Sequence, residues 1–95
     1  MGFDCAQRVY LYGLDVEYRL VHCYYIPFGL VTASELAITA KQLKYKYPSV
    51  CNVYAVDNGH MIYRAYMELL RDNSLENRVA FKLMLQQYGF EIGLA

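Results

Sequence analysis

The sequence contains no tryptophan, only two prolines and only three cysteines in 95 residues. Cys5, Cys23 and Cys51 are odd in number, and they form neither a CxxC pair nor a set with histidine at zinc-finger spacing. This pattern argues against a disulfide framework and against a structural zinc site. We therefore expect reduced thiols, a cytoplasmic location, no metal and no cofactor.

The chain also lacks an excess of charge of either sign, because nine basic side chains balance nine acidic ones. Proteins that bind nucleic acid through phosphate contacts usually carry a basic excess, so non-specific DNA binding is disfavoured. Neutrality also disfavours an acidic mimic of nucleic acid, although an uneven distribution of charge can exist within a zero total. Neither sign of charge therefore dominates the composition, and a nucleic-acid partner is possible but not favoured.

Long apolar segments are missing too. The longest one, around CYYIPFGLVTA, is interrupted by Pro27 and Gly29 and is too short to span a bilayer. No basic segment precedes an apolar one in the manner of a secretory signal. We expect a soluble intracellular protein without membrane association.

What the sequence does contain is largely apolar and aromatic. Hydrophobic residues make up 57% of the chain against 19% charged residues, and there are eleven tyrosines and four phenylalanines. This composition supports a packed core and argues against disorder. Since compact domains most often have roughly 100–150 residues, we expect one domain over 1–95.

Two helices are predicted. Thr32-Ala33-Ser34-Glu35 is a capping box that begins a helix over 32–47, and Pro48 ends it. A second helix over 74–88 begins after a polar cluster and ends with Gly89 as a left-handed C-cap. Apolar residues surround most of this second helix, and its spare face is formed by Leu75, Val79 and Leu83. We expect this face either to meet the first helix or the N-terminal segment, or to contact a partner or a second copy of the chain.

Five segments rich in β-branched and aromatic residues are predicted as strands: 8–13, 15–26, 50–57, 60–69 and 90–94. The second of these is expected to be long and largely buried. Asn58-Gly59 favours the backbone torsions of a type I′ turn, so a hairpin is predicted to join the third and fourth strands. From residue 15 the order is strand, helix, strand, strand, helix, strand. We therefore predict an α+β fold of the ferredoxin-like, split βαβ (βαββαβ) type, an antiparallel sheet with two helices on one face and an extra N-terminal strand.

The predicted hairpin has one half-solvated face, because alternate residues of a strand point to opposite sides of the sheet. The candidate partner-binding residues on this open face are His60, Ile62, Arg64 and Tyr66, extended by Arg19 and Tyr25. Tyrosine and arginine are residue types that dominate binding hot spots. An exposed strand edge and the spare face of the second helix are the alternative contact surfaces.

The spacing of reactive side chains predicts no catalytic group. His22 and Cys23 are neighbours in a predicted strand and point to opposite faces, which prevents direct pairing of a nucleophile with a base. His60 near Asp57 at the hairpin mouth is interpreted as a polar pair flanking a turn. We expect a protein that is not an enzyme and that has no metal site.

The segment VYLYGL (9–14) is similar to the first-strand hexamer of the RNA-recognition motif family, a resemblance that covers six residues, but GHMIYRAY lacks the second motif of that family. Our first hypothesis is a small non-enzymatic protein-binding module that forms a homodimer. Inhibitors of larger protein complexes made by phages, anti-CRISPR proteins among them, share this size and this lack of a catalytic motif, which suggests a viral inhibitor. The alternative is a single-stranded nucleic-acid-binding protein that uses tyrosine and arginine side chains of the open face.

Overall fold

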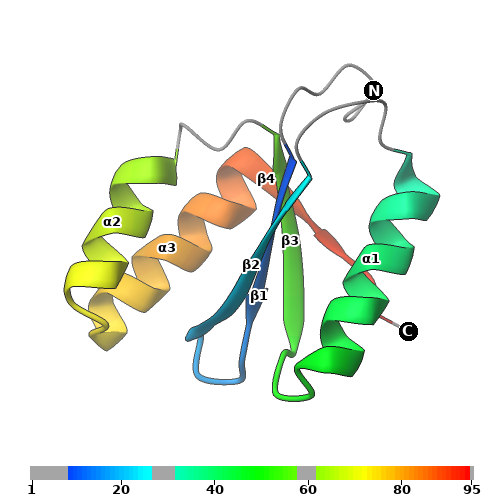
Figure 1. The fold of residues 1–95 in the computed structure, drawn as a ribbon. Coiled ribbons are helices and arrows are strands. Elements are labelled where there is room, and N and C mark those ends of the chain that lie inside the picture. The colour runs from blue at the N-terminus through cyan, green and yellow to red at the C-terminus, as the bar shows by residue number, and fades with distance from the viewer. Residues whose placement is uncertain (1–8, 27–31, 58–61, 95) are drawn as a thin grey trace.

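The computed structural model describes residues 9–26, 32–57 and 62–94, which form three layers (Figure 1). A sheet lies between one helix on one side and two helices on the other. The elements in chain order are β1 (Val9–Leu14), β2 (Leu20–Ile26), α1 (Ala33–Lys46), β3 (Asn52–Asp57), α2 (Tyr63–Arg71), α3 (Leu75–Tyr88) and β4 (Gly89–Ile92).

The sheet has the strand order β2-β1-β3-β4, and each neighbouring pair is antiparallel. Because β1 is antiparallel to both of its neighbours, β2 and β3 run parallel to each other with β1 between them. The helix α1 connects these two strands, which makes β2-α1-β3 a split βαβ unit. The predicted α+β class is therefore confirmed, and the arrangement is compatible with the ferredoxin-like plan.

Residues 63–71 form a helix, so the predicted strand over 60–69 is wrong, and the described part of the chain has three helices rather than two. The segment is apolar at strand spacing and also at helical spacing, because Ile62, Tyr66 and Leu69 follow one another at intervals of four and three residues. The helical face packs on the sheet, where Ile62 is fully buried. Asn58-Gly59 lies outside the described residues. The hairpin predicted around it lacks its second strand, because residues 63–71 are helical.

The sheet separates two hydrophobic cores. Between the sheet and α1, the strand residues Leu11, Val53 and Ala55 pack with Leu36 and Ala40 of the helix. On the other side, the core of α2 and α3 consists of Tyr12, Leu14, Tyr54, Val56, Ile62, Leu69, Phe81 and Leu85. Two helices, α2 and α3, therefore share one face, but the two helices that were predicted to do so, α1 and α3, lie on opposite faces. The physical reason is that β1 and β3 are apolar at almost every position, so both of their faces have to be covered.

The first helix follows its predicted boundaries closely. The Thr32 hydroxyl accepts a hydrogen bond from the Glu35 amide at 3.1 Å, and the Glu35 carboxylate accepts one from the Thr32 amide at 2.9 Å, which confirms the capping box. The helix α3 is capped by the Ser74 hydroxyl, which accepts from the Asn77 amide at 3.2 Å. Its C-cap is not left-handed as predicted, because Gly89 has an extended backbone with φ −138° and begins β4 directly.

The predicted strand over 15–26 is shorter and more exposed than expected. Residues 15–19 form a turn in which the Asp15 carboxylate accepts hydrogen bonds from the amides of Glu17 and Arg19, both at 2.8 Å. The strand β2 then lies at the edge of the sheet and none of its side chains is fully buried. Within the described ranges, no helix combines the length and apolarity that crossing a membrane requires.

Candidate functional site

The structure does not bring the predicted partner-binding residues together. Ile62 is fully buried, and Tyr66 is half-buried with its ring centroid 6.1 Å from that of Tyr12, so both belong to the core. Arg64 is exposed on α2, on the opposite side of the sheet from α1. The open sheet face on which this prediction depended is absent from the described part of the sheet, because helices cover both sides of β3.

The remaining predicted residues lie elsewhere. Arg19 sits in the turn between β1 and β2, where its guanidinium forms ion pairs with Asp15 at 3.2 Å and Glu17 at 2.6 Å. Tyr25 is 44% exposed on β2, and its ring packs against Tyr10 with a centroid distance of 4.9 Å. His60 lies outside the described residues. Among the predicted partner-binding residues, Tyr25 is therefore an exposed aromatic residue on an edge strand of the sheet.

The spare face of the second predicted helix is exposed. Leu75 is 59% exposed and Leu83 is 58% exposed, whereas Val79 is partly buried. The residues of α3 that pack on the sheet are Phe81 and Leu85. The expectation that the first helix covers this face is wrong, because α1 lies on the other side of the sheet (Figure 1).

The outer edge of β2 is one candidate contact surface. The strand LVHCYYI contains no charged residue and no proline, and within the described ranges it pairs with β1 alone. Tyr24 and Tyr25 are 46% and 44% exposed, and they point to opposite faces because they are neighbours in the strand. The other edge strand, β4, has only four residues.

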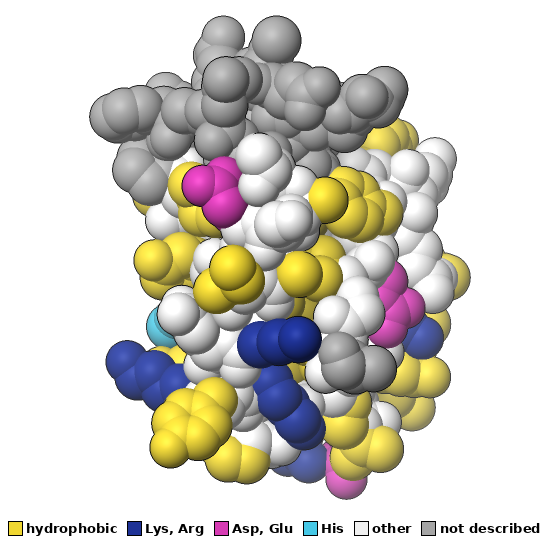
Figure 2. All heavy atoms as spheres, turned by 90° about the vertical axis from the view of Figure 1, so that its right-hand side faces the viewer, with side chains coloured by type: hydrophobic (Ala, Val, Ile, Leu, Met, Phe, Trp, Pro, Cys, Tyr) yellow, Lys and Arg dark blue, Asp and Glu magenta, His cyan; other side chains and the backbone are white. Residues whose placement is uncertain are grey.

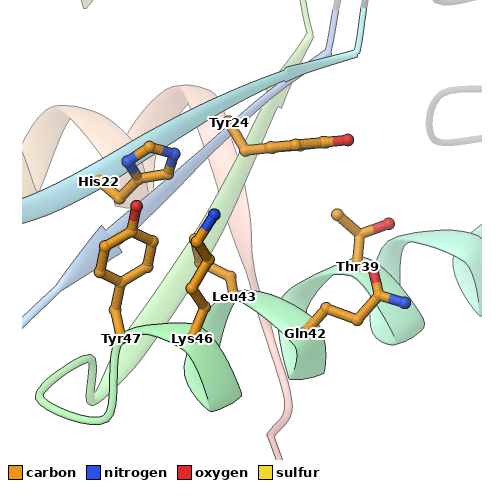
Figure 3. Close-up of a pocket in the computed structure, with 7 residues that line it drawn as sticks. All are labelled: His22, Tyr24, Thr39, Gln42, Leu43, Lys46 and Tyr47. Carbon is orange, nitrogen blue, oxygen red and sulfur yellow. The ribbon is translucent and has the colours of Figure 1, made fainter.

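A groove between β2 and α1 is the second candidate site. Its volume is about 200 Å³, and the described residues that line it are His22, Tyr24, Thr39, Gln42, Leu43, Lys46 and Tyr47 (Figure 3). The rings of His22 and Tyr47 stack with a centroid distance of 4.7 Å and an interplanar angle of 20°. The Lys46 ammonium lies 5.9 Å from the Tyr47 ring centroid.

An irregularity in the β1–β2 pairing places His22 in this groove. Gly13 is opposite His22 and Leu14 is opposite Leu20, so Val21 is an extra residue on β2. Val21 packs against the core under α1, and His22 reaches the C-terminal end of the same helix. The bulge therefore directs two consecutive side chains to the α1 side of the sheet.

The outer surface of α1 is basic. Three of the four lysines of the chain are in this helix, Lys41, Lys44 and Lys46. The ion pairs found among the described residues all involve arginine, at Arg19 and Arg71, so none neutralises these lysines. Figure 2, which faces α1, shows basic side chains gathered on the lower part of this surface.

Comparison with protein-family models, with curated proteins and with solved structures found no match. The function is therefore inferred from the geometry.

The reactive side chains considered in the sequence do not come together in the described part of the chain. No three or more His, Cys, Asp or Glu side chains of 9–26, 32–57 and 62–94 gather at a metal-binding geometry. His22 lies on the α1 side of the sheet, whereas Cys23 packs against the other core, so the two do not meet. Burial raises the pKa of the Cys23 thiol to about 11, which keeps it protonated and weakly nucleophilic near neutral pH.

We expect the protein to lose stability in mild alkali. Burial raises the pKa of Cys23 from 9.0 to about 11, and it raises the pKa values of Tyr12, Tyr54 and Tyr66 above the usual 10.0. Because these groups ionise earlier in the unfolded chain, stability is fully present below about pH 9 and falls as the pH rises toward 11. Urea unfolding at about pH 8 and about pH 10.5 measures this, with the lower midpoint expected at the higher pH. Equal midpoints would contradict the burial of these groups.

Proposed function

We propose that this protein is a small, non-enzymatic protein-binding module that contacts its partner through the outer edge of β2. One observation carries the proposal: a seven-residue edge strand has neither a charge nor a proline, and it displays a half-exposed tyrosine on each face. Soluble proteins commonly protect such edges with lysine, proline or a covering element, because unpaired backbone groups bind other strands. The bulge at Val21 lies near the start of β2, so the pairing with β1 is regular from His22 to Ile26.

An added strand would extend the sheet at this edge. In strand addition, backbone hydrogen bonds supply affinity and alternating side chains supply specificity, here Tyr24 on one face and Tyr25 on the other. Tyrosine is suited to this role because it offers a large contact area with few rotatable bonds. The proposed binding therefore depends on elements that are already folded in the isolated chain.

A second copy of the chain is the partner that we propose first. Two β2 strands paired antiparallel across a twofold axis would join two four-stranded sheets into one continuous sheet. The zero formal net charge of the chain adds no overall repulsion between copies. The free thiols of Cys23 and Cys51 fit the proposed cytoplasmic location. We propose inhibition of a larger complex as the role of such a contact.

The variant Tyr25→Lys is expected to convert a homodimer into a folded monomer, because a lysine on an edge strand opposes pairing with another strand. Light scattering at tens of micromolar measures the mass, and circular dichroism verifies the fold. The control Tyr45→Lys introduces the same charge at a residue that is 89% exposed on α1, and it should leave the dimer intact.

The variant Leu83→Glu separates the two candidate surfaces of self-association. If the β2 edge forms the contact, Leu83→Glu on α3 should leave the dimer mass unchanged. If Leu83→Glu is a monomer and Tyr25→Lys is still a dimer, the contact is formed by α3 instead. A monomeric unmodified protein would contradict the homodimer.

A further inference from the structure

We propose that the groove between α1 and β2 binds a single-stranded nucleic acid, with one base against Tyr24 and an adjoining phosphate near Lys46. This inference concerns the α1 side of the sheet; the groove shares Tyr24 with the proposed edge contact, but it needs no pairing of β2 strands. The occupant is identified from the ring geometry, the size and the charge of the groove.

Tyr24 offers a stacking surface. Its side chain is 46% exposed. Figure 3 shows the ring edge-on above Thr39 and Gln42, so one flat side of the ring faces α1 across the groove. Proteins that bind single strands use exposed aromatic rings in this way, since every base has a flat face. A base between Tyr24 and α1 would also lie near the amide of Gln42 and the hydroxyl of Thr39, both of which can form hydrogen bonds with base edges.

The groove has the size of one planar ring with a substituent. Its volume of about 200 Å³ is below the roughly 300–1,000 Å³ of sites for complete small-molecule ligands. The stacked rings of His22 and Tyr47 close one end of it. A single base of a longer strand fits this space, and the rest of the strand would continue over the surface of α1.

The charge of the groove complements a phosphodiester backbone. Among the described residues that line it there is one cation, Lys46, and no carboxylate. Lys41 is exposed on the same helix and takes part in none of the ion pairs of the described residues, whereas the Lys44 ammonium donates hydrogen bonds to the carbonyls of Pro48 and Val50 at 2.9 and 2.6 Å. Lys46 therefore supplies positive charge beside the groove in a chain whose formal net charge is zero, whereas Lys41 lies about 140° around the helix from it.

Binding of a fluorescent single-stranded oligonucleotide of about eight bases, measured by anisotropy at low salt, tests this inference. Tyr24→Ala is expected to weaken binding by about 5–150-fold, the range that corresponds to the loss of one base–aromatic stack. Tyr24→Phe should retain most of the affinity, because it keeps the ring. The matched control Tyr45→Ala removes a tyrosine of α1 that does not line the groove, and it should bind like the unmodified protein.

The lysine is tested by salt dependence. Each phosphate contact contributes about −0.7 to the slope of log K against log salt for a single strand, so Lys46→Gln should make the slope shallower by roughly that amount. The charge-matched control Arg64→Gln, on α2 across the sheet, should leave the slope unchanged.

Several outcomes would overturn the inference. The first two are no binding of the oligonucleotide at low salt and equal losses of affinity from Tyr24→Ala and Tyr45→Ala. The third is a duplex of the same sequence that binds as tightly as the single strand. The fourth is full competition by polyglutamate, which would indicate that the groove attracts any polyanion. A mononucleotide that binds as tightly as the oligonucleotide would overturn the assignment to a strand. Since dimer formation is tested with Tyr25→Lys, failure of the proposed edge contact and failure of this groove are separate results.

Discussion

Replacing Phe81 with alanine is expected to lower the free energy of unfolding by about 3–5 kcal/mol. Phe81 is completely buried on α3, and its ring meets that of Tyr12 edge to face, with a centroid distance of 5.3 Å and an interplanar angle of 82°. The Tyr66 ring of α2 is 6.2 Å away, so Phe81 joins both helices to the sheet. Since small domains are stable by only about 5–15 kcal/mol in total, this change removes a large fraction of the stability.

Urea denaturation followed by circular dichroism measures the effect of Phe81→Ala. The matched control is Leu83→Ala, two residues further along the same helix, where the side chain is 58% exposed. A change at such an exposed position is expected to alter stability by no more than about 0.5 kcal/mol. Similar losses from the two variants would mean that α3 does not present Phe81 to the sheet.

The variant Gly89→Ala is expected to destabilise the fold by about 1–3 kcal/mol or more and to displace β4. The cost is steric, because the extended backbone of Gly89 is one that any residue can adopt. An added Cβ would overlap the carbonyl oxygen of Ala55 and lie 2.8 Å from Cγ2 of Val56. Both neighbours belong to β3, which is held between β1 and β4 and cannot move aside without breaking pairs on both sides.

Gly93→Ala is the control for this second variant. A Cβ at Gly93 would have nothing within 4 Å, so the same substitution four residues later should be close to neutral. Thermal unfolding of the two variants beside the unmodified protein measures the difference. If Gly89→Ala melts at the same temperature as Gly93→Ala, the close approach of β4 to β3 is contradicted.

Elements with local signals were predictable from the sequence. The capping box at Thr32 and the stop at Pro48 act within one helical turn, and the helix begins and ends beside them. The polar cap at Ser74 defines the start of α3 in the same way. Such signals need no knowledge of what the element packs against, which is why these boundaries agree with the structure.

The segment after β3 was not predictable by the same means. Its apolar residues satisfy strand and helix spacing together, and Asn58-Gly59 favoured the strand interpretation. The outcome depends on tertiary contacts, since the helical arrangement buries Ile62 and Leu69 against the sheet while leaving Tyr63 61% exposed. The local pattern contains no information about that distant surface.

The candidate site was predictable only in part. Tyr25 was identified from its residue type, but the position of β2 at the edge follows from the strand order of the whole sheet. The groove depends on His22 meeting Tyr47, which is 25 residues away in the sequence, and on the extra residue Val21 in β2. Neither relation has a signature in the spacing of residues, because each arises when separate elements pack together.

The central position of β1 has a consequence for synthesis on the ribosome. This strand emerges before the other described elements, and β2 can pair with it after a short turn, but its second neighbour, β3, follows only after all of α1. The face of β1 that contains Tyr12 is covered only after Phe81 has been synthesised, near the C-terminal end of the described chain. Until Phe81 has been synthesised, a growing chain therefore carries this face of β1 uncovered, and this is the stage at which chaperones bind nascent proteins and at which premature release leads to aggregation.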